Sequence, residues 1–216
     1  MRKEMIAELE EYKIIGIFRG VTGENLINSV QALIDGGLHF IEITYNQKAE
    51  SKAETLDSIK LLKDHFKDKI RVGAGTVLNK EQVQMARAAG AEFIVAPNVC
   101  KEVIDEAHKY DMLCCPGACT CTEVVQAHDY GADFVKLFPA GTLGIKYSKD
   151  LIAPINHVRY LTTSGINEEV FEEFLKIGFS GAGVRGRLTD EKLINEGNFE
   201  EMTRRAKKFV EIAKKY

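Results

Sequence analysis

Two ionisable side chains interrupt otherwise apolar segments of this sequence. Lys136 lies within residues 134–139, which read FVKLFP, and Glu42 lies within residues 40–44, which read FIEIT. Removing a lone charge from water is costly, so such residues are usually paired with an opposite charge or used in function. This pattern indicates that Lys136 and Glu42 are candidate catalytic residues.

The chemistry that suits this pair begins with the amine. A lysine held away from water loses its proton more readily and becomes a nucleophile that attacks ketones. Attack on a 2-keto acid gives a carbinolamine and then an iminium, which accepts electrons and lets a carbon–carbon bond two atoms away break. Glu42 would shuttle the protons. The residues therefore predict Schiff-base chemistry on a small keto acid, and a buried structural ion pair is the alternative.

A repeating unit positions the two residues: a helical pattern, a glycine, two or three further residues and a short apolar strand. The unit recurs at four glycines: Gly37, Gly90, Gly131 and Gly178. Glu42 follows the first of them by five residues and Lys136 follows the third by five, so both stand at the same depth in their strands. Such a glycine ends a helix in the left-handed conformation, and the apolar run is a strand covered on both faces.

Extending this pattern along the chain predicts eight strands separated by helices. The strands lie near 13–18, 39–44, 70–73, 92–95, 112–115, 133–137, 158–161 and 179–183. The helices lie near 23–35, 50–66, 80–89, 100–110, 121–130, 145–152, 168–177 and 199–214. Alternating strands and helices predict parallel strands, and eight units fit a single-domain (β/α)8 TIM barrel over residues 1–216. A doubly wound open sheet is the alternative, but the first strand is not followed by the glycine-rich dinucleotide motif.

In a (β/α)8 barrel the carboxyl ends of the strands converge on the active site. Glu42 lies on the second predicted strand and Lys136 on the sixth, and even-numbered strands contribute to the same interior layers. The two side chains are therefore expected to meet.

Other predicted strand ends supply binding groups. Arg19 follows the first strand and is suited to bind an anion with two hydrogen bonds, although a salt bridge at the bottom or rim of the barrel is its alternative role. The small residues 73–75 are expected to leave space for a ligand carboxylate, and Thr76, which follows them, offers it a hydroxyl. Pro97 is expected on a rigid rim.

The segments after the seventh and eighth strands often bind phosphate in this fold. Residues 162–165 read TTSG, and residues 181–187 read GAGVRGR. Glycine N–H groups, a hydroxyl and arginine side chains all bind anions, so these segments predict an anion site. Its candidate residues are Ser164, Gly165, Gly183 and Arg185, while Arg187 is either a further ligand or a solvated surface charge.

Composition restricts the partners. The net charge of −3 argues against nucleic acid and against anionic membranes. The N-terminal residues contain no apolar signal region, and no apolar run approaches the roughly 18 residues of a transmembrane helix, so a cytoplasmic protein is expected.

The cysteines lie at positions 100, 114, 115, 119 and 121, an odd and clustered set. Reduced thiols are the preferred interpretation, because Cys114 and Cys115 would point to opposite faces of a strand and no C-x-x-C pair is present. Neither a metal nor a cofactor is predicted.

Several motifs in this order resemble the 2-keto-3-deoxy-6-phosphogluconate (KDPG) aldolases, a family that also cleaves 4-hydroxy-2-oxoglutarate (KHG). The resemblance covers essentially the whole chain. The motifs are IEIT at 41–44, GAGTV at 73–77, FIVAP at 93–97, PG at 116–117 and VKLFPA at 135–140.

The resemblance implies a class I aldolase on a (β/α)8 barrel, usually a homotrimer and without a metal, that releases pyruvate and an aldehyde such as glyceraldehyde 3-phosphate or glyoxylate. It implies that Lys136 forms the Schiff base and that Glu42 is the general acid/base. Thr76 would bind the pyruvyl carboxylate with help from Arg19. Phe138 would line the pocket together with Pro97.

The sequence departs from the family pattern at three places. Asn46 stands where many members have an arginine for the carboxylate. The family's Pro-Thr-Gly-Gly is TTSG at 162–165, and its phosphate-binding Gly-Ser is Arg185-Gly186. These changes leave open whether the distal group of the substrate is a phosphate or a carboxylate.

Two other functions fit the same residues. A sugar-phosphate isomerase or epimerase would use the lysine and the glutamate for proton transfer without an imine. A non-catalytic metabolite-binding barrel would use them only to hold a ligand.

Overall fold

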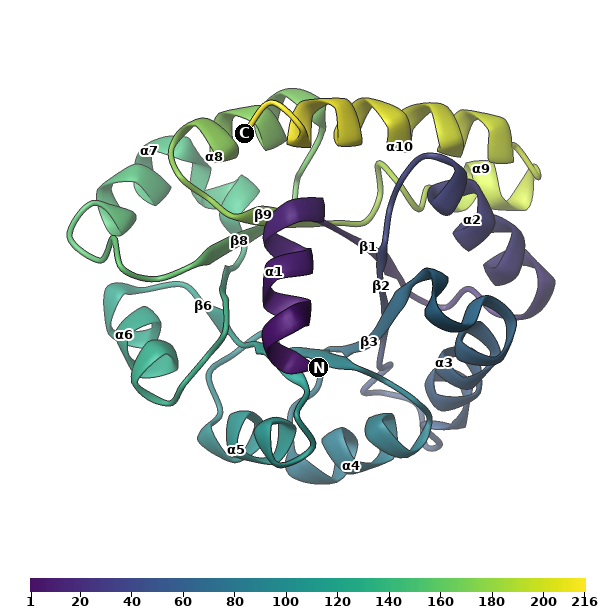
Figure 1. Cartoon of the computed structure of the whole chain (residues 1–216), viewed down its shortest axis with the longest axis horizontal. Coiled ribbons are helices and arrows are strands. Elements are labelled where there is room, and N and C mark those ends of the chain that lie inside the picture. Colours follow the sequence, from purple (N-terminus) through teal and green to yellow (C-terminus); the bar gives the residue numbers. More distant parts are fainter.

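The computed structural model describes residues 1–216 and contains a sheet of nine parallel strands surrounded by helices (Figure 1). The strands are β1 Ile14–Phe18, β2 Phe40–Thr44, β3 Arg71–Gly75, β4 Phe93–Val95, β5 Leu113–Cys115, β6 Gly117–Ala118, β7 Val135–Leu137, β8 Tyr160–Thr163 and β9 Gly181–Val184. The helices are α1 Arg2–Tyr12, α2 Gly23–Asp35, α3 Ala53–Phe66, the 3-10 helix η1 Lys67–Lys69, α4 Lys80–Ala88, α5 Lys101–Lys109, α6 Cys121–Asp129, α7 Ala140–Ile152, α8 Glu168–Lys176, α9 Glu191–Asn195 and α10 Phe199–Ala213.

Strands β5 and β6 are two halves of one barrel strand, interrupted at Pro116. The first half pairs with β4 and the second half pairs with β7. Across the interruption the Lys136 N–H donates to the Pro116 carbonyl over 2.9 Å. The sheet therefore closes through eight strand positions. This confirms the predicted (β/α)8 barrel, and the open-sheet alternative is wrong.

The predicted helix-ending glycines adopt the left-handed conformation. All four, at positions 37, 90, 131 and 178, have φ between 93° and 103°. An L side chain is strained in this region, whereas glycine adopts it freely. The repeated glycine therefore sets the angle at which the chain leaves each helix and enters the next strand.

Alternation along the strands decides which side chains face the barrel interior. Phe134 belongs to the cluster that fills the barrel, whereas Val135 and Leu137 belong to the cluster between the barrel and its helices. Since strand side chains alternate between faces, Lys136 faces the interior. The same alternation at Phe40 and Ile41 sends Glu42 inward.

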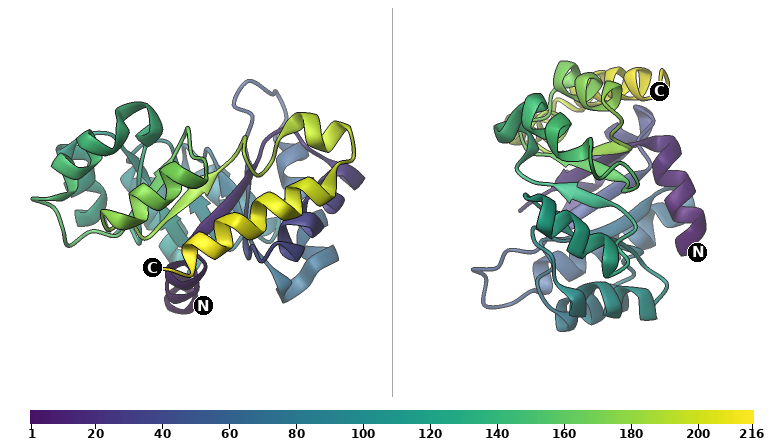
Figure 2. Two further views of the ribbon diagram at one scale, coloured as in Figure 1. Left: turned by 90° about the horizontal axis from the view of Figure 1, so that it is seen from above. Right: turned by 90° about the vertical axis from the view of Figure 1, so that its left-hand side faces the viewer.

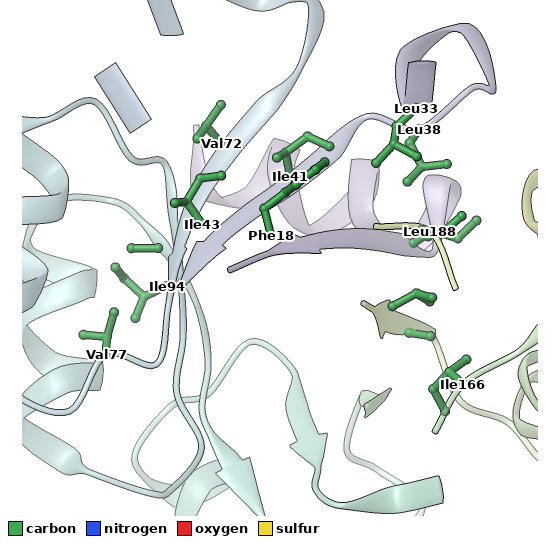
Figure 3. Close-up of a cluster of buried hydrophobic side chains, with 14 of the residues drawn as sticks. Phe18, Leu33, Leu38, Ile41, Ile43, Val72, Val77, Ile94, Ile166 and Leu188 are labelled. Atoms are coloured by element: carbon green, nitrogen blue, oxygen red, sulfur yellow. The ribbon is translucent and has the colours of Figure 1, made fainter. Parts of the chain in front are cut away.

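The outer cluster joins the strands to the surrounding helices (Figure 3). Phe18, Ile41 and Ile43 extend from the outer faces of β1 and β2, and Leu33 from α2 packs in the same cluster. This layer fixes the register of the strands whose inner faces carry the ionisable residues. None of the helices combines the length and the apolarity needed to span a bilayer.

Helix α1 closes the N-terminal end of the barrel and lies across the centre of the ring of strands in Figure 1. Met5 and Leu9 are fully buried and pack in the interior cluster with the aromatic rings of Phe40 and Phe134. Arg2 adds an ion pair with the buried Asp133 at 2.9 Å. The helix therefore seals the apolar lower part of the barrel beneath the ionisable residues.

The structure corrects some predicted boundaries. The last two strands begin two residues later than predicted, so Thr162 and Thr163 belong to β8, where they pair with Ala182 and Gly183 of β9. Threonine is favoured in strands, and its polarity misled the boundary assignment. Helix α7 is kinked at Gly144, which has φ of 79°: its second part begins at 145 as predicted, and the preceding turn from Ala140 was not predicted. Helices α1 and α9 were not predicted either.

Leu9→Ala tests the sealing role of α1. We expect a loss of about 2–5 kcal/mol in the free energy of unfolding, because the change leaves a cavity in the barrel interior. Denaturant unfolding measures this loss. Glu11→Ala on the exposed face of the same helix is the control and should change stability by less than about 0.5 kcal/mol. Equal effects of the two variants would show that α1 does not seal the barrel.

Candidate active site

A cavity of about 570 Å³ contains all ten residues predicted for the site. It lies at the carboxyl ends of the strands, and Figure 2 shows the loop between β2 and α3 projecting at this end, opposite α1. The ten residues are Arg19, Glu42, Thr76, Pro97, Lys136, Phe138, Ser164, Gly165, Gly183 and Arg185. Residues from seven strands or strand ends thus reach one cavity.

Lys136 lies at the base of this cavity with only 8% of its surface exposed. Its Nζ lies 5.1 Å from the centroid of the Phe138 ring, which suits a weak cation–π contact. Glu42 is also buried and lines the same cavity, but the two groups do not form a direct ion pair. The two side chains therefore meet, as predicted, by lining one cavity, and the space between them is left for a ligand.

Burial shifts both groups toward their neutral forms. It lowers the pKa of Lys136, and the negative charge of Glu42 only partly opposes this shift. It raises the pKa of Glu42, and the positive charges of Lys136 and Arg19 only partly oppose that shift. A neutral amine is a nucleophile, and a carboxyl group with a raised pKa can both give and take a proton.

Glycines of β3 make room for the interior side chains. A Cβ atom at Gly75 would lie 1.8 Å from Oε1 of Glu42, and a Cβ atom at Gly73 would lie 2.4 Å from the Phe93 ring. The Glu42 carboxylate therefore rests against the backbone of β3. The small residues were predicted to leave space for a ligand, but Glu42 itself fills the space over Gly75.

Arg19 and two threonines form a polar cluster beside Glu42. Arg19 donates from Nε to Oγ1 of Thr44 over 3.1 Å and from Nη2 to Oγ1 of Thr76 over 3.3 Å. Thr76 has φ of 59°, a strained conformation for a β-branched residue. The cluster groups two hydroxyls and a guanidinium, which are donors for a carboxylate.

Two glutamines hold the strained Thr76 backbone. Gln47 donates from Nε2 to the Thr76 carbonyl over 2.6 Å, and Gln82 donates from Nε2 to Oε1 of Gln47 over 2.9 Å. Gln82 is buried and also accepts from the Leu78 N–H over 2.7 Å. This chain of hydrogen bonds joins the loops after β2 and β3, so both glutamines position Thr76.

Asn46, which stands at the family's arginine position, does not line the cavity. Its side chain instead accepts a hydrogen bond from the Lys48 N–H over 3.0 Å within its own loop. The cation that lines the cavity beside Thr76 is Arg19.

The distal end of the cavity combines arginines with carboxylates. Arg185 pairs with Glu191 at 2.7 Å, and Arg187 pairs with Glu168 at 2.8 Å. Ser164 adopts φ of 82°, so the turn after β8 presents its residues to the cavity.

Comparison with known proteins places this geometry in a family. A family model described as KDPG and KHG aldolase matches residues 5–205. The chain belongs to this family. The protein is therefore an aldolase, a carbon–carbon lyase, as the resemblance implied.

Individual relatives of the aldolase support the same family assignment. It is 36% identical over 176 residues to the 2-dehydro-3-deoxy-6-phosphogalactonate aldolase of Escherichia coli K12, covering 81% of this chain and 83% of that protein. A solved native KDPGal structure is 32% identical with a TM-score of 0.82, covering 94% of both chains. A KDPG aldolase from Legionella pneumophila, in which pyruvate is captured at low pH as a covalent carbinolamine, is 25% identical with a TM-score of 0.83 and covers 94% of this chain and 96% of that one.

Seven residues of the aldolase's cavity were not among the ten predicted for the site, although Arg187 had been named as a possible further ligand. They are Ile17, Thr44, Thr163, Ile166, Asn167, Gly186 and Arg187. Thr44 follows Glu42 by two residues, so strand alternation could have identified it. Asn167 directly precedes the helix predicted near 168–177, so it could have been identified as the cap of that helix, but no sequence signal marks it as a cavity residue.

The cysteines of the aldolase are free. Cys114 packs in the outer cluster and Cys115 in the interior cluster, which confirms that the two point to opposite faces. Burial raises the pKa of both thiols, so both stay protonated and unsuited to bind a metal.

The charge coupling between Lys136 and Glu42 can be measured in the free aldolase. We expect the Lys136 ammonium to titrate below the ordinary lysine value of 10.5, because burial disfavours its charge. In Glu42→Gln the midpoint should fall further, because the carboxylate that stabilises the ammonium is gone. The ¹³C shift of the Lys136 ε-carbon, assigned with Lys136→Met, reports both values. A midpoint that rises in Glu42→Gln would contradict the coupling.

Proposed function

We propose that this aldolase is of class I, with Lys136 forming a Schiff base, and that it cleaves a KDPG-like acid or 4-hydroxy-2-oxoglutarate to pyruvate and an aldehyde. The observation that carries the proposal is the buried Lys136 amine, which shares a cavity with Glu42 but is not tied to it. An amine held by a direct ion pair would have to break that pair before it could attack.

The proposed reaction starts when the Lys136 amine adds to the C2 carbonyl of the keto acid. Loss of water from the carbinolamine gives the iminium. Glu42 then takes the proton of the C4 hydroxyl, the C3–C4 bond breaks, and its electron pair moves into the enamine as the aldehyde leaves. Protonation of the enamine at C3 and hydrolysis release pyruvate and restore the amine.

Thr76 and Arg19 are proposed to bind the keto acid's carboxylate. Their donor groups lie together beside Glu42, and a charged carboxylate forms stronger hydrogen bonds than a neutral acceptor. Pro97 and Phe138 are proposed to line the pyruvyl end. Ser164, Gly165, Gly183 and Arg185 are proposed to bind the distal part of the substrate. This division leaves the reacting bond between the two ends of the cavity.

We propose that the aldolase is a single domain that acts in the cytoplasm, as its repeating units and its sequence predict. We propose further that it assembles as a homotrimer, as the resemblance implies. Light scattering coupled to size-exclusion chromatography tests the assembly.

Pyruvate and borohydride test the Schiff base. We expect one reduced pyruvyl adduct per chain on Lys136, located by peptide mass spectrometry, because borohydride reduces the iminium to a stable amine. Lys136→Met should give no adduct and no cleavage. An isomerase or a metabolite-binding protein would give no adduct in the native chain either, so an unmodified native Lys136 would count against the proposal.

The glutamine chain gives a separate prediction. In Gln47→Ala we expect the KM for the keto acid to rise roughly three- to tenfold with a smaller change in kcat, because one hydrogen bond that positions Thr76 is lost. Steady-state kinetics of cleavage measure both constants.

The same kinetics with Thr76→Ala, alone and combined with Gln47→Ala, complete a double-mutant cycle. The combined variant should be little worse than Thr76→Ala, since Gln47 acts through Thr76. Additive losses in KM would contradict a positioning role for Gln47.

A further inference from the structure

Arg185 and Arg187 line the distal end of the cavity, and they differ in how easily each can leave its carboxylate partner to bind a ligand. Arg187 donates three hydrogen bonds to the Glu168 carboxylate, at 2.8, 2.8 and 3.1 Å. The side chains of this pair are 34% and 18% exposed, whereas those of Arg185 and Glu191 are 46% and 68% exposed. Exposed pairs contribute little and open easily, so Arg185 is free to turn to a ligand. Arg187 is held in a two-pronged pair that a ligand would have to break.

Glu168 is ionised in this pair. Its partial burial alone would raise its pKa, but the hydrogen bonds and charge of Arg187 outweigh burial, and the net pKa is lowered. The Glu168 charge thus cancels that of Arg187 beside the cavity.

The N-terminus of α8 next to Arg187 is also occupied. The Asn167 side chain accepts the Val170 N–H over 2.9 Å, and Glu168 and Glu169 place two negative charges in the first turn. A helix N-terminus normally attracts an anion, but these side chains repel one. Lys208 lies with Glu169 in a neighbouring cavity of about 510 Å³ and does not line the site.

We infer that Glu168 determines the specificity of the distal subsite: by holding Arg187 it selects a 4-hydroxy-2-oxo acid whose far end carries a single negative charge and disfavours a phosphate dianion. The inference rests on the proposed aldol cleavage. It also departs from the phosphorylated substrate named for the Escherichia coli relative. The single arginine left available, the exposed Arg185, matches a carboxylate with two parallel hydrogen bonds.

The test compares kcat/KM for 4-hydroxy-2-oxoglutarate and for 2-keto-3-deoxy-6-phosphogluconate. In the native chain the first should exceed the second by at least about tenfold, and Glu168→Gln should shift the ratio toward the phosphorylated acid by about tenfold, which is the effect of one freed charge-assisted hydrogen-bonding group. Glu169→Gln removes the same charge one residue further on and contacts no arginine, so the ratio should stay within about twofold. A native preference for the phosphorylated acid, or equal shifts in the two variants, would overturn the inference.

Calorimetric titration with inorganic phosphate tests the same subsite without any cleavage. Glu168→Gln should bind phosphate about tenfold more tightly than the native chain, and Glu169→Gln should not. Unchanged affinity in Glu168→Gln would overturn the inference even if borohydride traps pyruvate on Lys136. Tighter binding without trapping would support the subsite and contradict the proposed aldol mechanism, so the two failures are distinguishable.

Discussion

The free energy needed to hold the Lys136 amine away from water is the constraint on which this site depends. Phe134 lies two residues earlier on the same face of the chain, and α1 seals the barrel below it with Met5 and Leu9. Because water cannot reach the amine from that side, its charged form is disfavoured and the neutral nucleophile becomes accessible at a lower pH. A lysine at the rim of the barrel would keep its ordinary pKa. The helix at one end of the barrel therefore supports the chemistry at the other.

The same constraint explains how Glu42 is placed. Its carboxylate rests against Gly75 instead of forming an ion pair with Lys136, so a keto acid can enter between the two groups. The polar groups of Arg19 and Thr76 line the same cavity as the distal arginines. A substrate that spans both ends would present its reacting bond to the amine and the carboxylate. This is the positioning contribution that a rigid barrel makes to catalysis.

Much of this architecture could be predicted from the sequence, because the signals were local. Gly37 and Gly131, each five residues before one of the two ionisable residues, located the strands and showed that Glu42 and Lys136 lie at the same depth in them. Strand alternation then predicted that both side chains point into the barrel. The missing parts depend on tertiary contacts. Six of the eleven residues of α1 are charged, so its role appears only when Met5 and Leu9 meet the barrel. The Arg187–Glu168 pair joins residues 19 positions apart on two different elements, and no periodicity marks it. The strain at Thr76 likewise depends on Gln47 in another loop.

Exchange of the pyruvate methyl protons with solvent deuterium tests the cooperation of Lys136 and Glu42 most directly. The iminium must lose a methyl proton to become the enamine, and Glu42 is the base that takes it in this account. Proton NMR in D₂O should show rapid exchange with the native chain. In Glu42→Gln the exchange rate should fall by about 10²–10⁴, while borohydride still traps pyruvate on Lys136. Exchange at the native rate in Glu42→Gln would contradict the account, because the imine would then form and react without the carboxylate.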